Sequence, residues 1–111
     1  MPIKGIGVDL ENISRFKNKP FNKNKNFYKR IFTKKEIEYC LKKPNPYQHF
    51  TARFCAKEAF IKALNNDIKS YKSIEIEAKN KKPLLRWKGK SFLVSMSHDK
   101  EKAIAVVIVG H

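Results

Sequence analysis

One long helix constrains this chain more than any other sequence feature. Asn45 can act as its N-cap and Pro46 suits the first helical position, so we expect a helix over Pro46–Leu64. Asn65-Asn66 should end it, because asparagine tolerates the left-handed conformation that closes many helices. Most of its side chains are apolar, which predicts that the helix is packed in the core of the protein.

Four ionic side chains interrupt this apolar helix: Arg53, Lys57, Glu58 and Lys62. At about 100° per residue, Arg53 and Lys57 lie inside the apolar arc, and Glu58 with Lys62 lies on its border. No carboxylate occurs three or four residues from Arg53, so a buried cation there needs a partner from another element, another chain or an anionic ligand. Glu58 and Lys62 form either an ordinary helical salt bridge or part of a charged site.

The first predicted strand, Ile3–Leu10, contains two glycines and an acid. Gly5 and Gly7 permit the close approach of another backbone or a ligand. They do not begin a dinucleotide-binding loop, because the third glycine of the G-x-G-x-x-G motif is absent. We expect Asp9 at the exit of the strand, where it could cap the next helix. With Glu58 it would equally provide the two carboxylates that suit Mg²⁺.

Short helical segments are predicted between this strand and the long helix. Thr33 and Glu36 form a capping box, in which each side chain accepts a hydrogen bond from the other residue's backbone N–H, so a helix should begin there. The expected segments are a short helix from Glu11 or Asn12 that ends before Pro20, a polar loop or short helix over Phe21–Lys29, and a helix from Thr33 to about Lys42, stopped by Pro44.

Strands and turns follow the long helix, which indicates an α+β fold with a mainly antiparallel sheet. Ala103–Val109 is apolar throughout, so it should be a central strand. The expected strands are Ser73–Ala78, Leu84–Trp87, Phe92–Ser97 and Ala103–Val109, with turns at Lys82-Pro83 and Lys88-Gly89-Lys90.

The length of 111 residues predicts a single domain over residues 1–111. A deep two-walled cleft is hard to build from so short a chain, so we expect an active site shared between subunits. No run approaches the ~20 apolar residues that span a bilayer, and Met-Pro-Ile-Lys-Gly lacks a signal-peptide pattern, so we expect a soluble, cytoplasmic protein without a membrane partner. Cys40 and Cys55 lack metal-site spacing and are predicted to be reduced, packed thiols.

The net charge of +15 predicts an acidic partner, although part of the surplus is polar filler in Asn- and Lys-rich segments. Between Arg15 and Lys43 only two acidic residues oppose many basic ones. The partner could be a nucleic acid, an acidic protein or a polyphosphate. Nucleic-acid binding would use aromatic residues among basic ones, for which Tyr71-Lys72 and Arg86-Trp87-Lys88 are the candidates.

Four segments, taken in order, resemble the 4'-phosphopantetheinyl transferase family, in its small bacterial holo-[acyl-carrier-protein] synthase type. Glycines usually follow the central helix in that family, where this chain has Leu64-Asn65-Asn66-Asp67, and Lys81-Lys82-Pro83 stands where Gly-Lys-Pro is common. The matching segments are Gly5-Ile6-Gly7-Val8-Asp9-Leu10 with Ile13 and Arg15; Phe32-Thr33 with Glu36 and Cys40; Arg53-Phe54 with Ala56-Lys57-Glu58-Ala59 and Lys62-Ala63; and Ser95 with Ser97-His98.

The resemblance implies transfer of 4'-phosphopantetheine from coenzyme A to a serine of apo acyl carrier protein, with Mg²⁺ as cofactor and 3',5'-ADP as product, in support of fatty acid biosynthesis. Family members are homotrimers with active sites between adjacent subunits. Asp9 and Glu58 match the metal ligands, and Arg15 matches the docking surface for the acidic carrier protein. The positions that match the coenzyme A site are Arg53, Lys62, His98, Lys82 and Pro83.

A mechanism follows as a hypothesis. Glu58 takes the serine proton, directly or through a metal-bound water, and the alkoxide attacks the β-phosphorus while Lys62 and Mg²⁺ stabilise the departing phosphate. His98 and a free water are the alternative bases, and His49 is expected to have no functional role. Two rival functions remain, namely a small basic nucleic-acid-binding protein and a non-enzymatic scaffold that binds acyl carrier protein.

Overall fold

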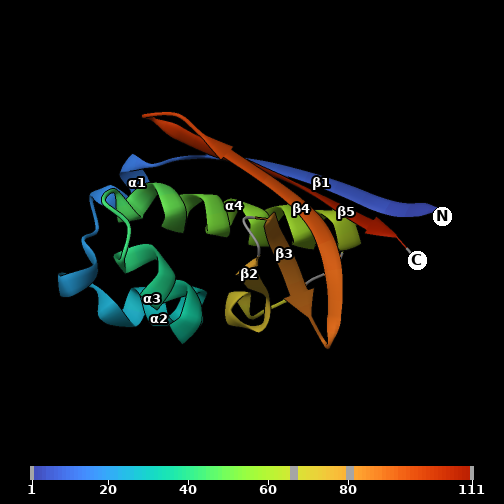
Figure 1. Ribbon diagram of the computed structural model, residues 1–111, viewed down its shortest axis with the longest axis horizontal. Helices are drawn as coiled ribbons and strands as arrows, with labels where there is room; N and C mark the ends of the chain where they lie inside the picture. The colour runs from blue at the N-terminus through green and yellow to red at the C-terminus, as the bar shows by residue number, and fades with distance from the viewer. Residues whose placement is uncertain (1, 66–67, 80–81, 111) are drawn as a thin grey trace.

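Helix α4 (Pro46–Leu64) lies across one face of a five-stranded antiparallel sheet (Figure 1). The structure is a computed structural model and describes residues 2–65, 68–79 and 82–110. Its sheet has the order β1-β5-β4-β3-β2, so β5 lies between two strands, as predicted, and the α+β class is confirmed. The strands are β1 (Ile3–Asn12), β2 (Glu75–Lys79), β3 (Lys82–Trp87), β4 (Lys90–His98) and β5 (Lys102–Gly110).

The backbones of β1 and α4 are in direct contact. A Cβ atom added to Gly7 would lie 1.8 Å from the carbonyl oxygen of Ala59, and one added to Gly5 would lie 2.0 Å from that of Ala63. Only glycine on the strand fits so close to the helix, where the facing residues are alanines. The predicted close approach of another backbone is therefore confirmed, and its partner is the long helix.

Two apolar clusters fill the interior. One lies between α4 and the sheet, and the other lies under the helices that gather beside the N-terminal half of α4 in Figure 1. Cys40 and Cys55 are free and buried, one in each cluster, as predicted. The smaller helical elements are α1 (Ser14–Lys17), η1 (Phe21–Lys23), α2 (Lys25–Ile31), α3 (Lys34–Leu41) and η2 (Tyr71–Ser73).

The helix signals in the sequence were largely correct. Both bonds of the predicted capping box form, since Thr33 Oγ1 accepts from the backbone N–H of Glu36 and the Thr33 N–H donates to Glu36 Oε1. Asn65 closes α4 in the left-handed conformation, with φ 49° and ψ 47°, while Asn66 lies outside the described residues. Asn45 occupies the N-cap position, but its side chain forms no capping bond.

Two boundary predictions were wrong. The first short helix does not begin at Glu11 or Asn12, because β1 stays paired with β5 as far as Asn12 and the N-cap is Ile13. Lys82-Pro83 is not a turn but the start of β3. Pro83 pairs with Ala78 of β2 but lies before the first pair of β3 with β4, which is Leu84 with Leu93. Its missing N–H therefore removes no hydrogen bond from the β3–β4 ladder, so proline is tolerated at this position.

Among the described residues, no helix covers the sheet face opposite α4 (Figure 1), and apolar side chains are exposed there. On this face Ile6 and Val8 are 66% and 52% exposed. A contiguous apolar surface of this kind marks an interaction site in many proteins. The exposed large apolar side chains of the sheet are Ile3, Ile6, Val8 and Leu10 of β1, Leu93 of β4 and Ile104 of β5. Within the described residues, no helix is both long and apolar enough to cross a membrane.

Replacing Gly7 by alanine should destabilise the fold. The added methyl group overlaps the Ala59 carbonyl, so β1 and α4 must separate, and we expect the free energy of unfolding to fall by about 1–3 kcal/mol or more. Urea denaturation measures this change. Gly89→Asn is the control, because a Cβ added to Gly89 would meet nothing within 4 Å and asparagine tolerates its φ of +76°. Equal stability of Gly7→Ala and the wild type would contradict the proposed contact.

Candidate active site

Asp9 lies within β1 and points towards α4. The strand alternates regularly, so Gly5, Gly7 and Asp9 share the inner face while Ile6 and Val8 point outward. The prediction that Asp9 stands at the strand exit was wrong, because pairing with β5 continues for three more residues. The regular strand buries the carboxylate of Asp9 instead of leaving it free to cap α1.

Lys62 of α4 binds Asp9 across the gap between helix and strand. Its Nζ donates to Asp9 Oδ1 at 3.0 Å and to the Val8 carbonyl at 3.2 Å. The hydrogen bond and the negative charge of Asp9 raise the pKa of Lys62. Glu58 lies one helical turn before Lys62, yet the ion pairs of the described residues do not join these two side chains. Lys62 therefore forms its salt bridge with Asp9 of β1 and not with Glu58 of its own helix.

The second oxygen of Asp9 is left without a partner. Asp9 Oδ2 is buried and accepts no hydrogen bond from the described residues. Leaving a buried carboxylate oxygen unpaired is unfavourable, so this atom is a natural ligand for a cation. Glu11, two residues on, shares the inner face, and burial together with its contact with Asp9 raises the pKa of Glu11. Acidic side chains thus gather at this end of β1, although Arg15 Nη1 partly balances them at 3.2 Å from Glu11 Oε1.

Glu58 is held by a residue far along the chain. The Tyr71 hydroxyl donates to Glu58 Oε1 at 2.5 Å. This hydrogen bond, followed by burial, raises the pKa of Tyr71 to about 12. Tyr71 belongs to η2, and the sequence marked it only as a possible base-stacking residue. Its position against Glu58 depends on tertiary packing that no local pattern reveals.

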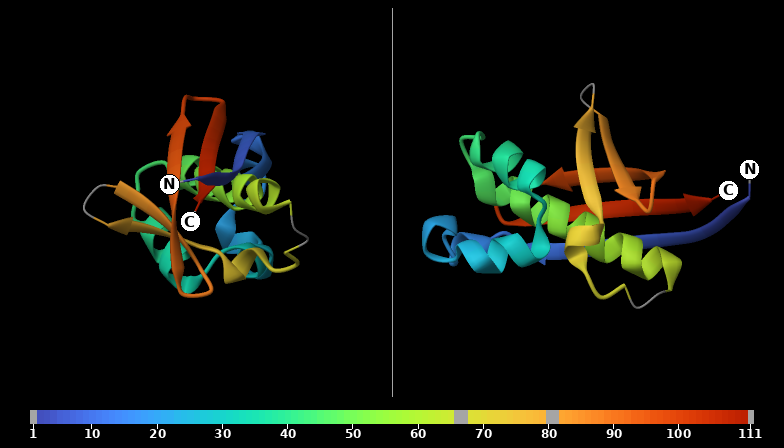
Figure 2. Two further views of the ribbon diagram at one scale, coloured as in Figure 1. Left: turned by 90° about the vertical axis from the view of Figure 1, so that its right-hand side faces the viewer. Right: turned by 90° about the horizontal axis from the view of Figure 1, so that it is seen from below.

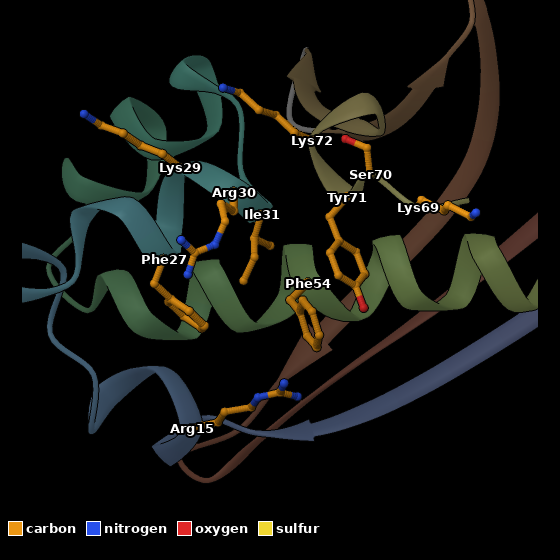
Figure 3. Close-up of a pocket in the computed structure, with 10 residues that line it drawn as sticks. All are labelled: Arg15, Phe27, Lys29, Arg30, Ile31, Phe54, Lys69, Ser70, Tyr71 and Lys72. Carbon is orange, nitrogen blue, oxygen red and sulfur yellow. The ribbon is translucent and has the colours of Figure 1, made fainter. Parts of the chain in front are cut away.

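A basic cavity opens beside Tyr71 (Figure 3). It has a volume of about 670 Å³ and lies among α1, α2, α4 and η2. The rings of Phe54 and Tyr71 lie side by side along its α4 wall in Figure 3, and the Arg15 guanidinium stands 4.8 Å from the centroid of the Phe54 ring. Among the residues that the structure describes, no acidic side chain lines it. The cations that line it are Arg15, Lys29, Arg30, Lys69 and Lys72.

Arg53 and His98 come close to a third residue, His49. Arg53 is 3% exposed, lies 4.2 Å above the centroid of the Tyr39 ring and donates weakly to the His49 carbonyl. Its Nε has no partner among the described residues. The rings of His49 and His98 are 5.8 Å apart, and burial, helped by the charge of Arg53, lowers the pKa of His49 to about 4. His49, expected to be without function, thus packs against His98 and accepts from Arg53 through its backbone carbonyl.

Lys57 has a structural role. Its fully buried Nζ donates to Glu36 Oε1 and the Ile31 carbonyl, both at 2.7 Å, and to the Tyr71 carbonyl at 3.1 Å. Burial lowers the pKa of Lys57, while the charge of Glu36 opposes that shift. Glu36 Oε2 in turn accepts from the N–H of Ile76. The partner that a buried cation requires is therefore supplied by α3, within this chain.

The profile of the 4'-phosphopantetheinyl transferase superfamily matches residues 5–108. The chain belongs to this superfamily. It is 42% identical over 115 residues to the holo-[acyl-carrier-protein] synthase of Chloroherpeton thalassium, covering 94% of this chain and 95% of that protein.

Solved structures of the family agree with the fold. The holo-[acyl-carrier-protein] synthase of Neisseria meningitidis superimposes with a TM-score of 0.86 at 26% identity, covering 99% of this chain and 100% of the other. The Helicobacter pylori synthase, solved in complex with coenzyme A, has a TM-score of 0.83 at 31% identity and covers 95% and 99%. The fold expected from the resemblance is therefore confirmed.

This member of the superfamily brings some of its predicted site residues together and leaves others apart. Asp9 and Lys62 are in contact, and Glu58 lies on the same stretch of α4 as Lys62. Lys82 and Pro83 belong to the β2–β3 hairpin, which stands out from the rest of the molecule in Figure 2. The hydrogen bonds and ion pairs of the described residues join neither of them to Asp9 or Glu58. Asn66, Asp67 and Lys81, where the chain departs from the family pattern, lie outside the described residues.

Replacing Lys57 by methionine should destabilise the protein strongly. The change leaves Glu36 buried without its cation, so we expect the free energy of unfolding to fall by about 3–5 kcal/mol. Chemical denaturation provides the measurement. The double variant Lys57→Met/Glu36→Gln should recover part of the loss, because both charges are gone. A single variant within about 1 kcal/mol of the wild type would show that the pair is not structural.

Proposed function

We propose that this protein transfers 4'-phosphopantetheine from coenzyme A to a serine hydroxyl of apo acyl carrier protein and releases 3',5'-ADP. The proposal depends above all on the unpartnered, buried Oδ2 of Asp9, whose other oxygen binds Lys62, one turn of α4 after Glu58. Phosphoryl transfer needs positive charge around a diphosphate and a base for the attacking hydroxyl. Membership of the superfamily and the activity named for its relatives support the assignment.

Asp9 and Glu58 would hold Mg²⁺. The free oxygen of Asp9 is a hard ligand of the kind Mg²⁺ prefers, and one or two carboxylates with phosphate oxygens and water normally complete such a site. When bound, the ion would neutralise charge on the coenzyme A diphosphate. In this structure the charge of Lys62 is paired with that of Asp9. Because the Lys62 side chain is exposed, it can turn to the substrate phosphate and would help the ion to neutralise the charge of the diphosphate.

Glu58 is the best-placed base for the serine proton. It lies one turn of α4 before Lys62, which binds Asp9, whereas the alternative base His98 stands against His49. The proton passes from the serine to Glu58, directly or through water, as the serine oxygen bonds to the β-phosphorus. The bond from that phosphorus to the bridging oxygen breaks, and Lys62 stabilises the charge on the departing 3',5'-ADP.

Coenzyme A would lie between subunits. Arg53 and His98, which both lie beside His49, would bind its phosphates, and Lys82 with Pro83 would line its adenine end. Because β2 and β3 lie at the edge of the sheet opposite β1, which carries Asp9, the complete site is best formed with a neighbouring copy. The apolar sheet face supports assembly, and the homotrimer remains our prediction. A single domain over residues 1–111, a cytoplasmic location and a role in fatty acid biosynthesis remain predictions as well.

The basic cavity would dock the acidic carrier protein. Arg15 of α1 lines it (Figure 3), together with Tyr71, whose hydroxyl binds Glu58. A nucleic-acid function has less support, because its candidate aromatic residues are occupied: Tyr71 binds Glu58, and Trp87 packs edge-on against Phe60. The scaffold alternative predicts docking without modification of the carrier protein.

Glu58→Gln should lower transfer at least ~100-fold while the thermal midpoint stays unchanged, because the amide cannot accept the serine proton. The assay is mass spectrometry of apo acyl carrier protein incubated with coenzyme A, with and without Mg²⁺. Glu38→Gln, an exposed change on α3, is the matched control and should retain full activity. Wild-type protein that binds the carrier without modifying it would support the scaffold instead.

Arg15→Glu should raise the KM for the carrier protein about tenfold, with little change in the KM for coenzyme A, because it reverses one charge of the docking surface. The effect should shrink as salt increases, since exposed charges are screened. Steady-state kinetics at low and high salt test this. Lys90→Glu makes the same charge change on an exposed residue at the start of β4 and should leave both constants unaltered. Equal changes in both KM values would argue against docking at Arg15.

A further inference from the structure

We infer that Tyr71 is a positioning residue, whose hydroxyl orients the Glu58 carboxylate for metal binding. The inference rests on the proposed function and adds a residue to its machinery. Tyr71 O–H donates to Glu58 Oε1 at 2.5 Å, and the described residues provide no other hydrogen bond to Glu58. One oxygen of the carboxylate is therefore occupied, which leaves Oε2 for the ion.

Both ends of Tyr71 are anchored on consecutive residues of α4. Its backbone carbonyl accepts from Lys57 Nζ at 3.1 Å, and its hydroxyl binds Glu58. Its ring packs against Phe54, with the ring centroids 5.4 Å apart. Figure 3 shows the side chain extending from η2 towards α4 beside Phe54. A residue held at its main chain, its ring and its hydroxyl has little freedom, so its hydroxyl is a fixed donor.

Glu58 needs such a support more than Asp9 does. Asp9 has a short side chain on a paired strand, and Lys62 already binds one of its oxygens. Glu58 has a longer side chain and lies at a partly exposed position of α4. A carboxylate that must bind a metal in one orientation gains affinity when a hydrogen bond holds that orientation in advance.

The buried Lys57–Glu36 pair gives this support its rigidity. Lys57 ties the Tyr71 carbonyl to α3 through Glu36 and to the end of α2 through the Ile31 carbonyl. The chain of contacts therefore runs from the helical cluster through Lys57 and Tyr71 to Glu58. The charged pair in the core and the carboxylate at the site are linked by one tyrosine.

Tyr71→Phe tests the inference, because it removes the hydroxyl and retains the ring against Phe54. We expect Mg²⁺, titrated alone into the protein and followed by calorimetry, to bind about ten- to hundredfold more weakly, at an unchanged thermal midpoint. In the transfer assay the Mg²⁺ concentration for half-maximal rate should rise, while kcat at saturating Mg²⁺ stays within about threefold of the wild type, because the metal itself then orders Glu58.

Two further variants separate positioning from general stability. Tyr47→Phe also removes a hydrogen-bonded hydroxyl, one that accepts from the Phe21 N–H, and should leave Mg²⁺ affinity unchanged. In a Glu58→Gln background, Tyr71→Phe should cause no additional loss of Mg²⁺ affinity, because the group it orients is already altered.

Each outcome has a definite meaning. Wild-type Mg²⁺ affinity in Tyr71→Phe, with transfer activity intact, would overturn the role of Tyr71 and leave the proposed function standing. An equal loss of affinity in the Glu58→Gln background would also overturn it, since the effect would not pass through Glu58. A wild-type protein that neither binds Mg²⁺ nor modifies the carrier protein would overturn the proposed function, and this inference with it.

Discussion

The contact of the β1 backbone with the α4 backbone determines where the candidate site can form. Gly5 and Gly7 let the strand approach Ala63 and Ala59 with no side chain between them. Asp9 occupies the next inward position of the same strand, so the close approach also brings its carboxylate within reach of Lys62. A wider separation would leave Asp9 in the same register but too far from α4 for this bond. The two glycines therefore allow the packing that brings Asp9 and Lys62 into contact.

The polar interior of the helical half depends on a second constraint. Lys57 could remain charged in the core only because Glu36 and two backbone carbonyls surround its ammonium group. Glu36 also completes the capping box of α3 and binds the N–H of Ile76, so one carboxylate joins a helix start, a buried cation and the sheet. Such a network specifies how α3, η2 and β2 lie against α4, and it thereby sets the position of Tyr71.

Local patterns predicted the elements well and the contacts between them poorly. Pro46, Asn65 and the Thr33 capping box mark helix ends through bonds to nearby backbone, so the bounds of α4 followed directly. The start of α1 could not be predicted in this way, because pairing with β5 extends β1 beyond the segment in which its apolar residues alternate. The same holds at Lys82-Pro83, where pairing with β2 overrides the turn preference of the dipeptide.

In the candidate site too, residues could be predicted from the sequence but contacts between elements could not. The residues of the family pattern indicated Asp9, Glu58 and Lys62, and the helical positions put Lys57 inside the apolar arc, but nothing local identified Glu36 as its partner. Glu11 and Tyr71 were missed as site residues for a related reason. Glu11 matters because it shares a strand face with Asp9, and Tyr71 because η2 folds back on α4. Both facts belong to tertiary structure.

The apolar outer face of β1 links folding to protein concentration. A chain that leaves Ile6, Val8 and Leu10 in water is stabilised by any copy that covers them, and mass action then makes its melting temperature rise with the amount of protein. Dilution would weaken such an assembly and, with it, any catalytic centre that needs two chains. A low specific activity in a very dilute sample would then reflect dissociation and not a defect in the chemistry.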